Sequence, residues 1–155
     1  MRLLLQRVHE GSVAIAGERV AEIGEGLVVL VGFGPEDTLS MRGGKVWNAM
    51  LEKLAGLRIF PDEEGKMNLS VGETGRDVLL VSQFTLYADT RKGRRPSFHV
   101  SANPAVAEPL FLACIEDMQK RLPGKIRHGV FGADMDVSLI NWGPVTIMLD
   151  SADFS

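Results

Sequence analysis

The sequence contains a single cysteine, Cys114, among its 155 residues. One cysteine excludes an intrachain disulfide and a metal cluster built on cysteine ligands. Apolar residues surround it at helical spacing, namely Leu110, Phe111, Ile115 and Met118. This pattern predicts a buried and unreactive thiol.

Long hydrophobic runs are also missing. Leu3-Leu4-Leu5 is followed at once by Gln6 and Arg7, so it is too short for the core of a signal peptide. No apolar stretch approaches the ~20 residues that a membrane-spanning helix requires. The net charge of −3 gives no global positive field, so any contact with nucleic acid must come from a local patch. We therefore expect a cytoplasmic protein.

Several familiar catalytic motifs are absent. There is no Gly-x-Ser-x-Gly elbow and no phosphate loop that ends in Gly-Lys-Ser/Thr. The three histidines, His9, His99 and His128, are scattered, and none has a carboxylate at the spacing of a zinc signature. The sequence thus predicts no metal site and no cofactor, and it offers no evident pair of nucleophile and base.

The composition is that of an ordinary globular protein, with 45% hydrophobic and 24% charged residues, and the length suits one domain over residues 1–155. Asn103 followed by Pro104 is a good start signal for a helix that runs to about Leu122, with a kink expected at Pro109. An earlier helix is predicted at about 38–56, weakened at its start by two glycines. Strands are predicted at about 2–8, 12–16, 19–23, 27–33, 57–60, 67–71, 126–131, 134–140 and 145–150. We predict an α+β fold, strand-rich, with antiparallel or mixed barrel-like sheets flanked by two helices.

The most informative stretch is the strand that begins at Val78. Residues 78–81 are apolar on both faces, which is typical of a strand buried from both sides, and Ser82-Gln83-Phe84-Thr85 follows with no charge. If the strand continues, Gln83 and Thr85 share one face, about 7 Å apart, while Ser82 and Phe84 share the other. Neutral hydrogen-bonding groups against a dry core indicate the floor of a pocket, although serine and threonine also close many ordinary strands.

Two other segments carry chemical signals. The loop after this strand holds four cations in five residues, Arg91, Lys92, Arg94 and Arg95, which is either a solvated surface or a phosphate-binding patch. Residues 141–144 join two predicted strands and read as a hairpin tip. A cis bond before Pro144 has a base rate of only about 5–6%, so the local sequence favours a trans turn.

Together, Ser82-Gln83-Phe84-Thr85-Leu86 and the later Asn141-x-Gly143-Pro144-Val145-Thr146 resemble the bacterial D-aminoacyl-tRNA deacylases, which clear D-amino acids from tRNA. The resemblance extends over nearly the whole chain. Further matching blocks, in order, are Gln6-Arg7-Val8, Ser12-Val13, Arg58-Ile59-Phe60, Gly65-Lys66-Met67-Asn68, Arg95-Pro96-Ser97-Phe98 and Ala133-Asp134-Met135.

This resemblance implies a homodimer that hydrolyses the ester between a D-amino acid and the terminal ribose of tRNA. In such enzymes the Gly–Pro bond is cis, and its loop enters the partner's active site as a filter that excludes L side chains. Carried over, Gly143 and Pro144 of one chain would face the catalytic residues Ser82, Gln83, Phe84 and Thr85 of the other. Position 142 varies within this motif, and Trp142 is a bulky residue there. By the same resemblance, the substrate would also contact Ala133, Met135, Asn141, Val145 and Thr146.

The resemblance further implies a reaction without a protein base. Backbone N–H groups around Gln83 and Phe84 would stabilise the oxyanion, and the 2′-OH of the terminal adenosine would assist. Thr85 would then position groups, while a nucleophilic role for it stays open. A backbone filter also implies that glycyl-tRNA enters the site. The basic loop would bind tRNA phosphates.

Two other functions stay possible on the sequence. The first is a hydrolase in which Thr85 or Ser82 attacks with a histidine as base. The second is an RNA-binding module that uses the basic loop and only holds the acceptor end of a tRNA.

Overall fold

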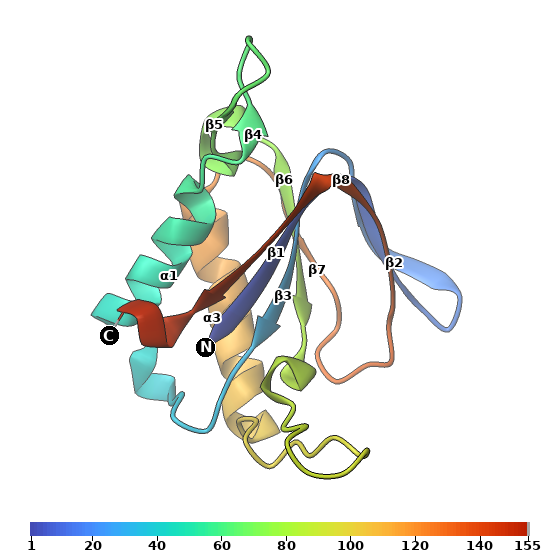
Figure 1. The fold of residues 1–155 in the computed structure, drawn as a ribbon, viewed down its shortest axis with the longest axis vertical. Helices are drawn as coiled ribbons and strands as arrows, with labels where there is room; N and C mark the ends of the chain where they lie inside the picture. Colours follow the sequence, from blue (N-terminus) through green and yellow to red (C-terminus); the bar gives the residue numbers. More distant parts are fainter. Residues whose placement is uncertain (155) are drawn as a thin grey trace.

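The computed structural model describes residues 1–154, and a strongly bent mixed sheet is its centre (Figure 1). The strand order is β2-β1-β3-β6-β7, with β8 paired to β1 as well, which gives a nearly closed, barrel-like sheet. Neighbouring strands pair antiparallel except β3–β6 and β6–β7, which are parallel. The strands are β1 (Arg2–Ile15), β2 (Glu18–Ile23), β3 (Gly26–Gly32), β6 (Asp77–Ser82), β7 (Ile126–His128) and β8 (Asp136–Asp150).

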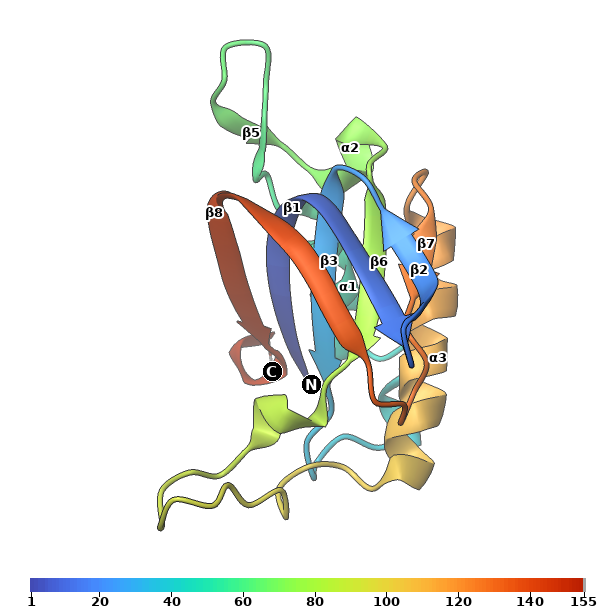
Figure 2. The same cartoon turned by 90° about the vertical axis from the view of Figure 1, so that its right-hand side faces the viewer.

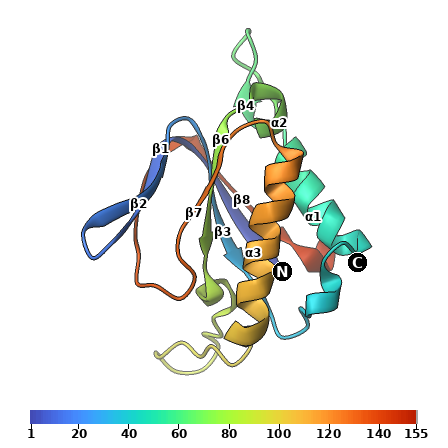
Figure 3. The same cartoon turned by 180° about the vertical axis from the view of Figure 1, so that it is seen from behind.

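Two long helices cover one face of this sheet, which Figure 3 shows from behind. They are α1 (Lys45–Gly56) and α3 (Pro104–Arg121), and the latter continues through Pro109 as one element. A small hairpin of β4 (Phe60–Pro61) and β5 (Met67–Leu69) projects at one end of the molecule. The short elements are α2 (Val71–Thr74) and the 3-10 turns η1 (Leu39–Met41), η2 (Phe84–Tyr87) and η3 (Ser151–Phe154). The predicted α+β class is confirmed.

Strand β6 is buried on both faces, as its composition predicts. Val78 and Leu80 belong to the large core between the sheet and the helices, whereas Leu79 and Val81 belong to a second core on the opposite side of the sheet. All four side chains are at most 1% exposed. The strand therefore delivers the residues that follow it to a fixed position at the edge of both cores.

Four local predictions are wrong. The strand that carries the polar stretch ends at Ser82, and residues 84–87 form η2 instead of continuing it. The expected pairs of strands at 2–8 and 12–16, and at 134–140 and 145–150, are two long strands, β1 and β8, which pair with each other along their length. Residues 141–144 are thus no hairpin tip. The Gly143–Pro144 bond is cis, as the resemblance implies, and not trans as the local sequence favours. The prediction also lacks the short helix α2, although its capping box Ser70-x-x-Glu73 is visible in the sequence.

Candidate active site

The polar stretch leaves the sheet at Ser82 and turns into η2. Gln83 has a non-helical backbone, and Phe84 begins the 3-10 turn. Gln83 and Thr85 therefore do not share a strand face, yet their side chains meet: Gln83 Nε2 donates to Thr85 Oγ1 at 2.6 Å. The Thr85 side chain is exposed rather than set in a dry core.

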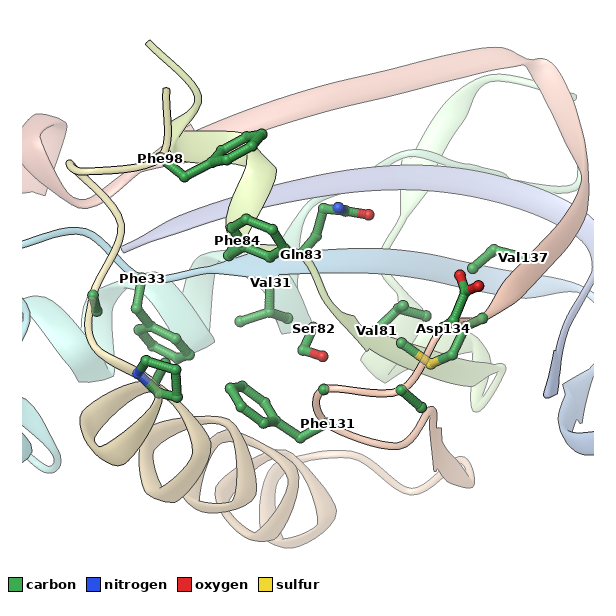
Figure 4. Close-up of a pocket in the computed structure, with 16 residues that line it drawn as sticks. Val31, Phe33, Val81, Ser82, Gln83, Phe84, Phe98, Phe131, Asp134 and Val137 are labelled. Atoms are coloured by element: carbon green, nitrogen blue, oxygen red, sulfur yellow. The ribbon is translucent and has the colours of Figure 1, made fainter. Parts of the chain in front are cut away.

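A pocket of ≈ 590 Å³ opens beside this turn, between the end of β6, the start of α3 and the segment before β8 (Figure 4). It contains five of the predicted residues, Ser82, Gln83, Phe84, Ala133 and Met135. Thr85 does not line it and reaches it only through Gln83. The other lining residues are Val31, Phe33, Val81, Phe98, Ala102, Pro104, Ala107, Phe131, Gly132, Asp134 and Val137.

Aromatic rings form much of the pocket wall. Phe84 and Phe98 meet edge to face with centroids 4.9 Å apart, and they stay 55% and 40% exposed. Phe33 and Phe131 lie on the side of α3 in Figure 4. Large apolar side chains with this much exposure, next to a cavity, are typical of a ligand-binding surface.

The backbone of η2 offers two hydrogen-bond donors, one at Phe84, which lines the pocket, and one at the next residue. The amide of Gln83 is already used, because it donates to Val31 O at 2.7 Å. The amides of Phe84 and Thr85 have no backbone acceptor within residues 1–154. The expectation of donors around Gln83 and Phe84 is thus shifted by one residue along the chain.

Charge is scarce in this pocket. Asp134 is the one ionisable residue among those that line it, and it is absent from the site predicted on the sequence although it stands between Ala133 and Met135. Its place in the site depends on how the segment before β8 folds back over α3, which local sequence does not reveal.

The three histidines have partners elsewhere. His99 Nδ1 pairs with Ser97 Oγ, His128 Nδ1 with Gly129 O, and His9 Nδ1 lies 3.5 Å from Glu25. In the described part of the chain none of them is bonded to Ser82 or Thr85. The geometry of these residues therefore provides no nucleophile–base pair of the kind that a serine or threonine hydrolase requires.

The Gly143-Pro144 motif forms a bulge in β8. Gln6 pairs with Thr146 and Val8 with Asn141, so four residues of β8, 142–145, stand opposite the single residue Arg7. Hydrogen bonds close the neck of this bulge: Asn141 Nδ2 donates to Thr146 Oγ1 at 2.8 Å, and Val145 N donates to Asn141 Oδ1 at 3.2 Å. Gly143 and Pro144 themselves are exposed.

Arg7 anchors the bulge from beneath and is missing from the predicted site, although it lies in a block that the resemblance matched. Its side chain is only 7% exposed, and burial lowers its pKa. Nε donates to Trp142 O at 3.1 Å and Nη1 to Ile59 O at 2.5 Å, while the guanidinium lies 4.4 Å from the centre of the Trp142 ring.

The pocket and the bulge lie apart in the chain's fold. The pocket is lined by the end of β6, whereas the bulge shares a groove with Pro61 and Met67 of the β4–β5 hairpin, which projects at the other end of the molecule (Figure 2). There, Gly143, Pro144 and Val145 line a separate shallow groove of ≈ 320 Å³. One chain therefore does not bring the two halves of the predicted site together.

The basic loop follows η2 at the end of the molecule opposite the β4–β5 hairpin. Arg91 binds back to Asp89 through Nε and Nη2, at 2.8 and 2.7 Å, and this holds the pKa of Asp89 well below its usual range. Lys92, Arg94 and Arg95 are exposed and form no ion pair with any residue from 1 to 154.

Residues 1–154 contain no group of three or more His, Cys, Asp or Glu side chains placed to hold a metal ion. No helix in this range is long and apolar enough to cross a membrane.

Comparisons with known proteins agree on one family. The family described as D-Tyr-tRNA(Tyr) deacylase matches residues 4–150. A protein from Solidesulfovibrio magneticus named D-aminoacyl-tRNA deacylase is 63% identical over 153 residues, 99% of this chain and 97% of that protein. A solved structure of the c-Myc DNA Unwinding Element Binding Protein is 39% identical, with a TM-score of 0.87 over 97% of this chain and 98% of that one. A probable eukaryotic D-amino acid tRNA deacylase shares the fold at 21% identity, with a TM-score of 0.78 over 96% and 97% of the two chains. The chain belongs to the D-Tyr-tRNA(Tyr) deacylase family of enzymes.

Proposed function

We propose that this enzyme hydrolyses the ester bond of D-aminoacyl-tRNA and releases the free D-amino acid and the tRNA. One observation carries the proposal: the family's polar stretch, Ser82 to Thr85, stands at the edge of a pocket that has aromatic walls and almost no charge. Such a pocket suits the terminal adenosine and its aminoacyl group better than a phosphate. The reaction takes place in the cytoplasm, and residues 1–155 act as one domain.

The chemistry needs little from side chains because an aminoacyl ester is already activated. The amides of Phe84 and Thr85 are the donors that would stabilise the oxyanion, and a single donor of this kind is worth roughly 3–4 kcal/mol in known enzymes. The 2′-OH of the terminal adenosine assists the attack of water. Thr85 positions Gln83 through their hydrogen bond. In the described chain no histidine is bonded to the hydroxyl of Ser82 or of Thr85, which argues against either one as a nucleophile.

Selection for the D configuration comes from a second copy of the chain. Gly143 and Pro144 are exposed and far from their own pocket, so they are free to enter the pocket of a partner. Their carbonyls would hold the α-amino group of the substrate, with Asn141, Val145 and Thr146 shaping the bulge that presents them. A site built from backbone carbonyls selects the configuration at the α-carbon and does not distinguish one D side chain from another. Glycyl-tRNA, which has no side chain to exclude, is therefore also a substrate.

The surface of β8 supports a homodimer. This strand pairs with β1 and is long, with Ile140 53% and Met148 47% exposed. A long edge strand that exposes apolar side chains tends to pair or pack with another chain. A two-fold dimer would cover this strand and complete both active sites at once.

The tRNA body is held by the basic loop. The segment that follows η2 carries four exposed cations, Arg91, Lys92, Arg94 and Arg95, so a nucleotide in the pocket would bring neighbouring phosphates close to them. Each phosphate that a cation neutralises releases bound counterions, so this binding weakens steeply as salt rises. With four cations engaged, we expect tRNA affinity to fall on the order of 100-fold between about 50 and 200 mM salt.

The deciding experiment incubates the protein with tRNA charged with D-tyrosine, L-tyrosine or glycine, side by side. Release of D-tyrosine and glycine, with L-tyrosyl-tRNA left intact, is the expected result. If D-tyrosyl-tRNA binds but is not cleaved, the protein is an RNA-binding module and the proposal is wrong. If a covalent acyl-enzyme accumulates, the nucleophile mechanism replaces the backbone mechanism.

A further inference from the structure

The side chain at position 142 has two charged or ionisable neighbours against its ring. Trp142 stacks on His9, with centroids 4.6 Å apart and ring planes inclined by 22°, and it packs on the guanidinium of Arg7 at 4.4 Å. Phe60 meets it edge-on at 6.3 Å. We propose that Trp142 is a positioning residue for substrate selection, because it fixes the bulge that presents Gly143 and Pro144. This inference rests on the function proposed above.

Apart from Val145, which packs against the core, the bulge has few other constraints. Residues 142–145 make no pair in the β1–β8 ladder, and Gly143 and Pro144 are exposed. The hydrogen bonds of Asn141 hold only the neck. A site that uses backbone carbonyls to distinguish D from L substrates must hold those carbonyls in position to within a fraction of an ångström. Side-chain contacts on the inner side of the bulge must therefore fix its position.

Arg7 and Trp142 stabilise each other's position. The carbonyl of Trp142 accepts from Arg7 Nε, and its ring covers the same guanidinium. Arg7 also lies directly under Gly143, since a Cβ built on that glycine would meet Nη2 at 2.7 Å. The indole thus packs Arg7 against the bulge, and a small residue at position 142 would remove this packing and leave the guanidinium held only by its hydrogen bonds to the carbonyls of residue 142 and Ile59.

Two further residues, Glu25 and Arg76, connect the stack of Trp142 and His9 to other parts of the chain. Glu25 reaches His9 at 3.5 Å and accepts from Arg76 Nη2 at 3.0 Å, and the hydrogen bond from Arg76 lowers the pKa of Glu25. The guanidinium of Arg76 in turn lies 5.1 Å from the Phe60 ring. Trp142 is consequently packed inside its own protomer, and a role in the dimer interface is not needed to account for this bulky residue.

The test compares Trp142→Ala with Trp142→Phe, which keeps an aromatic ring on Arg7 and His9. Rates of deacylation are measured on D-tyrosyl-tRNA and L-tyrosyl-tRNA, and the readout is the ratio of the two. We expect Trp142→Ala to lower this D/L ratio about tenfold or more and Trp142→Phe to lower it less than about threefold, since aromatic–cation packing at partly buried sites has about that strength. His9→Ala, which removes the stacking partner together with its contact to Glu25, should lie between them.

Leu112→Ala is the matched control, because Leu112 is 49% exposed on α3 and its loss should leave the ratio unchanged. A loss of stability alone would lower both rates together and keep their ratio. If Trp142→Ala keeps the wild-type ratio within about twofold, the inference is wrong. If Trp142→Ala fails to fold, a wild-type ratio in His9→Ala overturns it instead.

A parallel variant separates this inference from the function on which it rests. Gly143→Ala places a methyl group against Arg7 at a backbone φ of +119° that favours glycine, so it must distort the bulge itself. If Gly143→Ala changes the D/L ratio and Trp142→Ala does not, only the role of Trp142 is wrong. If neither changes it, the bulge is no chirality filter and the proposed selection mechanism fails.

Discussion

At the scale of single residues, the hydroxyl of Thr85 separates two mechanisms. It accepts a hydrogen bond from Gln83 and has no histidine or other base beside it in the described structure. Removing one neutral hydrogen bond costs about 0.5–1.5 kcal/mol, so Thr85→Ala should slow D-tyrosyl-tRNA hydrolysis by no more than about tenfold. Rates under single-turnover conditions measure this directly. Complete loss of activity in Thr85→Ala, with full activity in Thr85→Ser, would instead indicate a nucleophilic hydroxyl.

Arg7 is expected to matter for stability as well as for selection. Replacing it by Ala removes the donors to Trp142 O and Ile59 O and uncovers the indole. Because one buried acceptor and one partly buried acceptor then lose their partner, we expect the free energy of unfolding to fall by about 2–4 kcal/mol in urea titrations. Arg19→Ala is the control: its ion pair with Glu22 is exposed, and the expected change is below about 1 kcal/mol. Equal losses in both variants would show that Arg7 is not an anchor.

At the scale of elements, the composition of a segment predicts whether a strand is buried. It does not predict where a strand bends or how far it continues. Residues 78–81 are apolar on both faces, and the strand lies between two cores as expected. Local sequence does not reveal that β1 and β8 continue through their irregular middles, because each is held by pairing with the other, far away in the chain. The turn at Gln83 escapes prediction for a similar reason: its amide is bound by Val31 of β3. The family resemblance points to the polar stretch as a whole, and only the geometry of residues 1–154 distinguishes the amides of Phe84 and Thr85, which have no backbone acceptor, from that of Gln83.

The start of α3 connects helix stability with the pocket, since Pro104 and Ala107 line it. Asn103 caps this helix by accepting from Ala105 N at 2.9 Å, as the sequence predicts. Asn103→Ala should therefore destabilise the fold by about 1 kcal/mol, whereas Asn103→Asp, which keeps a cap acceptor, should change it little. Thermal unfolding of the three proteins tests this. Equal melting temperatures for the Ala variant and the wild type would mean that tertiary contacts alone fix the helix start.

At the scale of the whole molecule, the separation of pocket and bulge predicts complementation between two damaged chains. Gly143→Ala spoils the bulge and leaves the pocket intact, whereas Ala133→Trp fills the pocket and leaves the bulge intact. If the bulge acts in the partner's pocket, each homodimer is defective at both sites. A heterodimer of the two variants combines a sound bulge with a sound pocket at one of its two sites.

Mixing the two variants under conditions of subunit exchange should therefore restore D-tyrosyl-tRNA hydrolysis to about a quarter of the wild-type rate, because half of a random mixture is heterodimer and each heterodimer has one intact site. The wild-type D/L ratio should return with it, since the restored site has both halves undamaged. Mixing either variant with a copy of itself is the control and should restore nothing. A site built within one chain cannot be repaired by exchange, so a mixture no more active than its components would contradict the cross-subunit arrangement, even if each variant alone loses activity as expected.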